Sequence, residues 1–106
     1  MQQNLASILV ALRREFSQLL GDQLEAMYLY GSQARGDAQP NSDIDVLAVM
    51  RGEFDYDALI DRTSEIVSEL SLQHDVVISR VFTSRDHFER ARTPFLLNVR
   101  REGIAI

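Results

Sequence analysis

Residues that could bind phosphate and metal gather in one short stretch of the chain. Asp43 and Asp45 stand at the entrance to an apolar run, and ten residues separate them from Gly31 and Ser32. Because side chains alternate along a strand, the two aspartates would share one face and Ile44 would take the other. Two carboxylates ~4 Å apart repel by about 4 kcal/mol at an effective dielectric of ~20. This pair therefore requires a bound cation or a shared proton.

Magnesium is the cation that this pattern favours. Mg²⁺ prefers one or two carboxylates together with substrate phosphates and water. Gly31 would let the backbone approach a phosphate, and a short helix beginning at Ser32 would add free N–H groups and a hydroxyl. Each residue also has a simpler explanation: two solvated acids, a turn glycine and a helix N-cap. The spacing favours a phosphate-binding turn that faces the carboxylate pair.

Two strands must position these side chains. Met27–Tyr30 and Ile44–Met50 are rich in aliphatic and aromatic residues, as is typical of strands covered on both faces. Asp37–Ser42, which contains Pro40 and Asn41, is predicted to be a loop that turns the chain back. Because this connection is short, the two strands are predicted to be antiparallel neighbours.

A third strand is predicted to bring one more acid to the same end of the sheet. Apolar residues at helical spacing follow the second strand, after a cap at Asp55 or Asp57, and His74–Val81 then has the composition of a strand. A strand–helix–strand succession predicts a parallel crossover. Asp75 would then enter the sheet beside Asp43 and Asp45.

The remaining segments are predicted to be helical except at the end. An amphipathic helix opens the chain; its apolar positions are Leu5, Ile8, Leu9, Leu12, Phe16, Leu19 and Leu20. Thr83 or Ser84 is expected to cap a short helix through Arg90, a further helix runs from Thr93 through Arg101, and 104–106 could add an edge strand. The predicted fold is a single α/β domain over residues 1–106, a mixed sheet flanked by helices.

Composition excludes several classes of function. The net charge is −5 and the pI is near 4.9, which argues against direct binding of nucleic acid through its phosphates. With no cysteine, thiol nucleophiles and Cys-based zinc sites are excluded, and with no lysine so are Walker-type phosphate sites. The apolar run Leu5–Leu12 lacks preceding basic residues and is too short to span a membrane. We expect a cytoplasmic protein.

G-S-Q-A-R-G at residues 31–36 and S-D-I-D-V at 42–46 carry a resemblance to a known family. Together they resemble the signature of the DNA polymerase β-like nucleotidyltransferases, and more closely that of the minimal nucleotidyltransferases, the MNT antitoxins encoded beside HEPN-domain toxins. The pattern is specific because its two halves, their spacing and the flanking strands must agree. The resemblance implies a fold similar to the polymerase β-like palm.

The resemblance also implies roles for individual residues. Gly31 and Ser32 would hold the β- and γ-phosphates of a nucleoside triphosphate, expected to be ATP. Asp43 and Asp45 would hold two Mg²⁺ ions, with Asp75 as a further metal ligand and the general base.

Arg35 lies three residues after Ser32, on the same side of a helical turn. Its guanidinium could contact the triphosphate or form a surface ion pair with Asp37.

The acceptor of the nucleotidyl group is the part that the motif does not define. The chain leaves no room for an acceptor-binding domain, so the acceptor surface is expected on another chain. The resemblance implies a HEPN toxin, an RNase, adenylylated on a tyrosine hydroxyl. Two alternatives remain: a binding antitoxin that neutralises the toxin without catalysis, and an enzyme that modifies a small molecule, similar to the aminoglycoside-modifying relatives.

Overall fold

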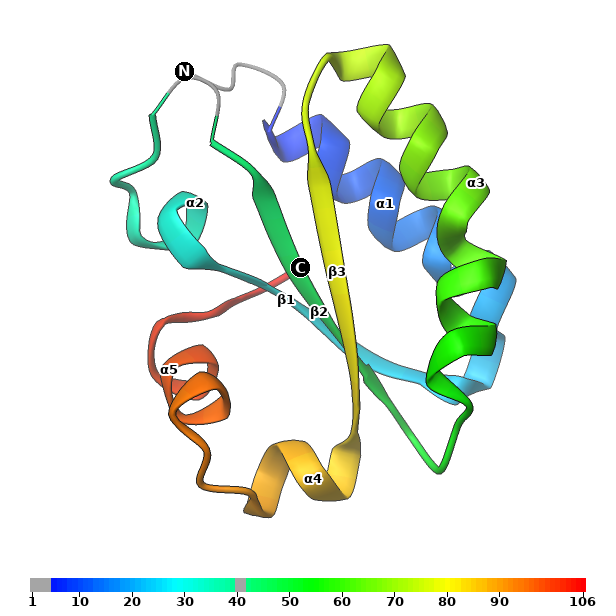
Figure 1. Cartoon of the computed structure of the whole chain (residues 1–106), viewed down its shortest axis with the longest axis vertical. Helices are drawn as coiled ribbons and strands as arrows, with labels where there is room; N and C mark the ends of the chain where they lie inside the picture. Colours follow the sequence, from blue (N-terminus) through cyan, green and yellow to red (C-terminus); the bar gives the residue numbers. More distant parts are fainter. Residues whose placement is uncertain (1–4, 40–41) are drawn as a thin grey trace.

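A mixed four-stranded sheet forms the centre of the part of the chain that the computed structural model describes, residues 5–39 and 42–106 (Figure 1). The strand order is β3-β2-β1-β4. β1 is antiparallel to both β2 and β4, whereas β2 and β3 are parallel. The strands are β1 Leu24–Tyr30, β2 Ile44–Met50, β3 Ile78–Ser84 and β4 Ile104–Ala105. The predicted α/β fold and both strand orientations are confirmed.

Three of the helices begin where capping residues in the sequence predict. The side chains of Asp55, Ser84 and Thr93 each accept a backbone N–H bond at the start of the helix that follows. The helices are α1 Leu5–Leu20, the 3-10 turn η1 Gly21–Gln23, α2 Gly31–Arg35, α3 Tyr56–His74, α4 Arg85–Arg90 and α5 Pro94–Glu102. None of the helices among the described residues is both long enough and apolar enough to span a membrane.

One face of the sheet is closed by α1 and α3, which lie side by side in Figure 1. Alternate residues of β2 point into this larger core, where they meet the fully buried α1 side chains Ile8, Leu12 and Phe16. Phe16 stacks on Phe82 of β3 with ring centroids 6.3 Å apart. The alternation that buries Ile44 and Val46 turns Asp45 to the opposite face.

The opposite face is covered in part, by α4 and α5. A smaller cluster joins Leu47 and Val49 of β2 to Leu96 and Val99 of α5. Arg100 of α5 holds the α4 end in place, because its guanidinium donates to the carbonyl oxygens of residues 88 and 91. This face carries the polar end of β2.

β3 begins later than predicted. α3 continues to His74, and Asp75 ends it in the left-handed conformation (φ 53°, ψ 50°), with its N–H bonded to the Ser71 carbonyl. Aspartate tolerates this conformation better than most residues do, so the helix ends without a glycine. The strand predicted over His74–Val81 therefore starts only at Ile78.

Arg80 joins β3 to α3 through bonds that the sequence pattern did not indicate. Its Nε donates to the buried Thr63 hydroxyl at 3.2 Å, and its Nη2 donates to the Ile60 carbonyl at 2.8 Å and to the Ser64 hydroxyl at 3.2 Å. Thr63 Oγ1 itself donates to the Leu59 carbonyl at 2.8 Å. The buried hydroxyl is thus satisfied, and the crossover helix is fixed against the strand.

Candidate functional site

The glycine–serine turn lies directly against one of the two aspartates. Tyr30, the last residue of β1, pairs with Asp45 of β2, and Gly31 follows with φ 75°. A Cβ at Gly31 would lie 2.5 Å from Asp45 Oδ2, closer than such atoms approach. Glycine is therefore required here both for its backbone conformation and for the space that the carboxylate occupies.

Asp43 and Asp45 form an electrostatically coupled pair. Asp45 is half-buried and Asp43 is exposed. Burial, and then the neighbouring Asp43 carboxylate, raise the pKa of Asp45. Burial, followed by the Asp45 charge, also raises the pKa of Tyr30. Two interacting carboxylates at the start of an inner strand supply the hard oxygen donors that fit a divalent cation such as Mg²⁺.

Ser32 is the second residue of the short helix α2, beside this pair. Its carbonyl accepts the N–H groups of Gly36 and Asp37 at 3.0 and 3.2 Å, and Gly36 ends the helix with φ 83°. The Ser32 side chain is half-buried. The turn that was predicted to bind phosphate thus lies next to the acids at which β2 begins.

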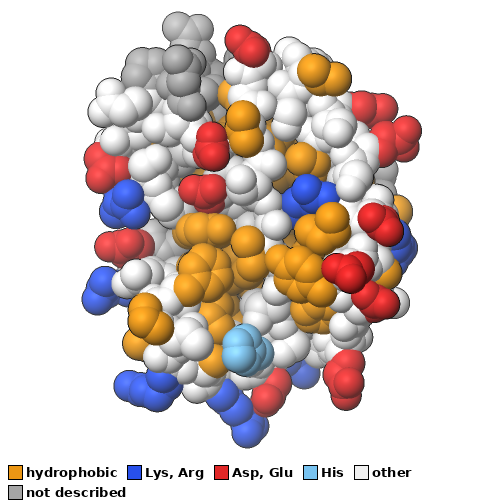
Figure 2. Space-filling view, viewed as in Figure 1, with side chains coloured by type: hydrophobic (Ala, Val, Ile, Leu, Met, Phe, Trp, Pro, Cys, Tyr) orange, Lys and Arg blue, Asp and Glu red, His pale blue; other side chains and the backbone are white. Residues whose placement is uncertain are grey.

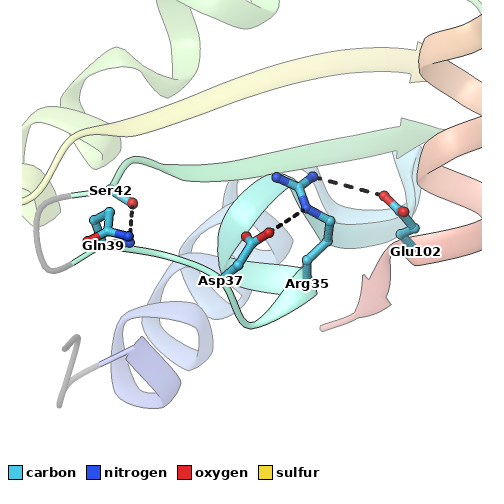
Figure 3. A network of polar contacts seen from close by, with 5 residues as sticks. All are labelled: Arg35, Asp37, Gln39, Ser42 and Glu102. Atoms are coloured by element: carbon cyan, nitrogen blue, oxygen red, sulfur yellow. Dashed lines mark hydrogen bonds and ion pairs between the residues drawn. The ribbon is translucent and has the colours of Figure 1, made fainter.

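Arg35 is held by two carboxylates. Its Nε lies 3.3 Å from Asp37 Oδ2, and its Nη1 lies 4.0 Å from Glu102 Oε1 at the end of α5 (Figure 3). The predicted pairing with Asp37 is therefore present. The contact with a triphosphate stays a prediction.

Asp75 is not brought to the other two acids. It is exposed at the end of α3, three residues before β3, and the residue that pairs with Asp45 is Ser79. Within residues 5–39 and 42–106, no three acidic or histidine side chains come together as a metal site. The interpretation of Asp75 as the start of a strand was wrong because the helix continues for longer.

An aromatic surface borders the acids. On the side of the molecule seen in Figure 2, acidic side chains lie near the middle, next to a hydrophobic patch. Phe95 of α5 meets Tyr30 edge-on with ring centroids 5.2 Å apart, and Tyr28 stacks on Phe88 at 5.1 Å. The sequence pattern did not indicate these partners of the two tyrosines on α4 and α5.

A comparison with protein families identifies the family to which this chain belongs. The nucleotidyltransferase domain family matches residues 9–102, which include the glycine–serine turn and both aspartates of the pair. The chain belongs to this family. The catalytic class is therefore that of a nucleotidyltransferase.

Curated relatives of this nucleotidyltransferase come from Methanocaldococcus jannaschii. The protein MJ0141, provisionally named a protein adenylyltransferase, is 29% identical over 99 residues, which are 93% of this chain and 95% of the relative. MJ0604, with the same provisional name, is 37% identical over 81 residues, or 76% of this chain and 75% of the relative.

Solved structures show the same fold. A Sulfolobus solfataricus protein, provisionally named a nucleotidyltransferase, has a TM-score of 0.70 at 20% identity, covering 98% of this chain and 80% of its own. A toxin–antitoxin structure with AMP-PNP has a TM-score of 0.63 at 22% identity, covering 93% of this chain and 69% of its own.

Proposed function

We propose that this nucleotidyltransferase uses Mg²⁺ to transfer AMP from ATP to a hydroxyl group on a partner protein. The single observation that carries the proposal is the contact between Gly31 and Asp45, in which a Cβ would lie 2.5 Å from the carboxylate oxygen. This contact joins the turn suited to phosphate to the acids suited to metal. A bound triphosphate would therefore meet both at once.

Each residue of the site has a proposed task. Gly31 and Ser32 bind the terminal phosphates, and Asp43 and Asp45 hold the metal. Mg²⁺, when bound, would neutralise charge on the transferring phosphoryl group and on the leaving pyrophosphate. Without the cation, burial and then the neighbouring Asp43 charge raise the pKa of Asp45.

The position of Asp75 does not support the role of general base. Asp75 is exposed at the end of α3, and the residue that the sheet register places beside Asp45 is Ser79. We therefore place the reaction on the pair Asp43 and Asp45. Asp75 acts in the structure as the residue that ends α3.

A HEPN-type toxin is the proposed partner. Two relatives are named as protein adenylyltransferases, and one structural neighbour is a toxin–antitoxin structure with an ATP analogue. The net charge of −5 also favours a protein acceptor over nucleic acid held through its phosphates. The acceptor hydroxyl is proposed to be that of a tyrosine, as the family resemblance implies.

The experiment that tests this function uses the full chain, ATP, Mg²⁺ and the toxin encoded beside its gene. Intact-mass spectrometry should show the toxin gaining AMP, and the Asp43→Asn, Asp45→Asn double variant should not produce this gain. No mass change with the wild-type chain would contradict transfer to this partner. Neutralisation that survives in the double variant would indicate an antitoxin that acts by binding alone.

A further inference from the structure

Asp45 and Asp43 are positioned by different means. Asp45 lies within β2, paired with Tyr30 on one side and Ser79 on the other, and it packs against Gly31. Asp43 precedes the strand and is exposed. Its position therefore depends on the segment just before it.

Among the residues that the structure describes, the side chain of Gln33 in α2 is bonded to that segment. Gln33 Nε2 donates to the Ser42 carbonyl oxygen at 3.3 Å. The Ser42 carbonyl and the Asp43 N–H belong to one planar peptide unit. The bond from Gln33 therefore orients the peptide plane that leads into Asp43. Gln33 is half-buried and follows Ser32 directly, which places its backbone in the phosphate-binding turn.

Ser42 is also fixed from the loop side. Its N–H donates to the Gln39 carbonyl at 3.0 Å, and its hydroxyl accepts the Gln39 N–H at 2.8 Å (Figure 3). These bonds set the local turn, but they do not connect it to the glycine–serine turn. Gln33 supplies that connection.

We propose that Gln33 is a positioning residue that sets the place of Asp43 relative to Gly31 and Ser32. This inference rests on the proposed function, in which one Mg²⁺–ATP complex is held by both groups. If the Asp43 carboxylate and the glycine–serine turn are held in a fixed relative position, the binding of metal and the binding of nucleotide support each other. Without the Gln33 bond, each part can still form, but the two are less well aligned.

The test replaces Gln33 with methionine, which has similar length and no donor. In calorimetric titrations with ATP, we expect the Mg²⁺ concentration for half-maximal binding to rise about three- to tenfold, as the loss of one hydrogen bond implies. ATP binding in EDTA and the thermal unfolding midpoint should stay at wild-type values. Gln33→Leu repeats the test with a second apolar side chain.

Gln39→Met is the matched control, because Gln39 contributes to the same loop through its backbone. It should retain the wild-type Mg²⁺ dependence. An unchanged Mg²⁺ dependence in both Gln33 variants would overturn the inference. So would an equal loss of ATP binding in EDTA accompanied by a lower unfolding midpoint, since that pattern indicates a purely structural role.

Hydrogen exchange separates this inference from the proposed function. In Gln33→Met the Ile44 amide, whose N–H donates to the Val77 carbonyl at the entry to β2, should exchange several-fold faster than in wild type, whether or not the protein binds ATP. A wild-type chain that does not bind Mg²⁺–ATP would contradict the proposed function alone. An unchanged exchange rate at Ile44 would contradict the role of Gln33.

Discussion

The two faces of the sheet divide stability from chemistry. On one face, β2 contributes Ile44, Val46, Ala48 and Met50 to the core under α1 and α3, and these side chains have at most 1% exposure. On the other face the same strand carries Asp45, then Leu47 and Val49, under α4 and α5. One strand thus serves both purposes because its side chains alternate.

The difference shows where the fold tolerates unfavourable interactions. The closed face satisfies even its buried hydroxyl at Thr63, which donates to Leu59 and accepts from Arg80. On the open face two carboxylates are neighbours, and burial followed by the Asp43 charge raises the pKa of Asp45. Such local repulsion is typical of sites that await a ligand. Substitutions on the two faces should therefore affect different measurements.

The largest expected effect is the loss of activity in the Asp43→Asn, Asp45→Asn double variant. Metal contributes several kcal/mol to the stabilisation of transition-state charge, so transfer should fall by about 10³-fold or more. The free energy of unfolding should be unchanged or higher, because a repulsion is removed. AMP transfer rates and urea denaturation measure the two effects. Asp61→Asn, on the exposed side of α3, is the control; a double variant with near wild-type turnover would contradict the site.

Phe16→Ala should give the opposite result on the closed face. Removing this fully buried ring should lower the free energy of unfolding by about 3–5 kcal/mol. Transfer per folded molecule should stay near wild type, as measured at low temperature after correction for the folded fraction. Val10→Ala on the same helix, where Val10 is 64% exposed, should change stability by no more than ~0.5 kcal/mol. Equal losses from the two variants would contradict this core.

Gly31→Ala tests the contact that joins the two halves of the site. The new methyl group would meet Asp45 and would also strain a backbone with φ 75°, so transfer should fall by about 10²-fold. Gly36→Ala is the matched control, because Gly36 has φ 83° but no atom lies within 4 Å of an added Cβ. It should lose about 1–2 kcal/mol of stability and keep its turnover. Similar turnover in the two alanine variants would show that the contact with Asp45 is not needed.

Asp75→Asn should have a smaller effect on activity. Asparagine also accepts the left-handed conformation that ends α3. The unfolding midpoint should therefore be unchanged, and kcat should remain within about twofold of wild type. A general base, by contrast, contributes about 10²–10⁴-fold. A loss of that size in kcat, with the unfolding midpoint unchanged, would show that Asp75 reaches the site during the reaction.

The smallest expected effect is a pH dependence of stability at Asp45. Its folded pKa is raised, so the folded protein binds more protons than the unfolded chain between the ordinary and the raised pKa. Stability contributed by this group is therefore lost as pH rises through that window. In metal-free buffer, Asp45→Asn should unfold at a higher temperature than wild type at neutral pH. The difference should vanish in more acidic solution, and a variant less stable at neutral pH would contradict the sign.

Local signals predicted much of the fold. Asp55, Ser84 and Thr93 cap helices in the structure because a cap needs only its own side chain and the next N–H groups. The end of α3 was harder to locate. The segment from Leu72 to Val77 has no glycine to mark the end of the helix, and Asp75 takes that role through its tolerance of positive φ.

The residues of the candidate site could also be predicted in part from local signals. The identity and spacing of Gly31, Ser32, Asp43 and Asp45 are visible in the chain, because the predicted chemistry depends on those residue types. The bond from Gln33 to Ser42 gave no signal, since glutamine at a surface position has many possible partners. The pairing of Arg35 with Glu102 also joins distant segments.

The sequence by itself determined which atoms are available: a flexible glycine, a hydroxyl and two carboxylates two residues apart where one strand begins. Only the tertiary structure decided which of them meet. The register of β1 on β2 presses Gly31 against Asp45, and the register of β2 on β3 places Ser79 there while Asp75 remains at the end of α3. Register is set by the packing of both sheet faces, and that packing depends on residues far apart in the chain.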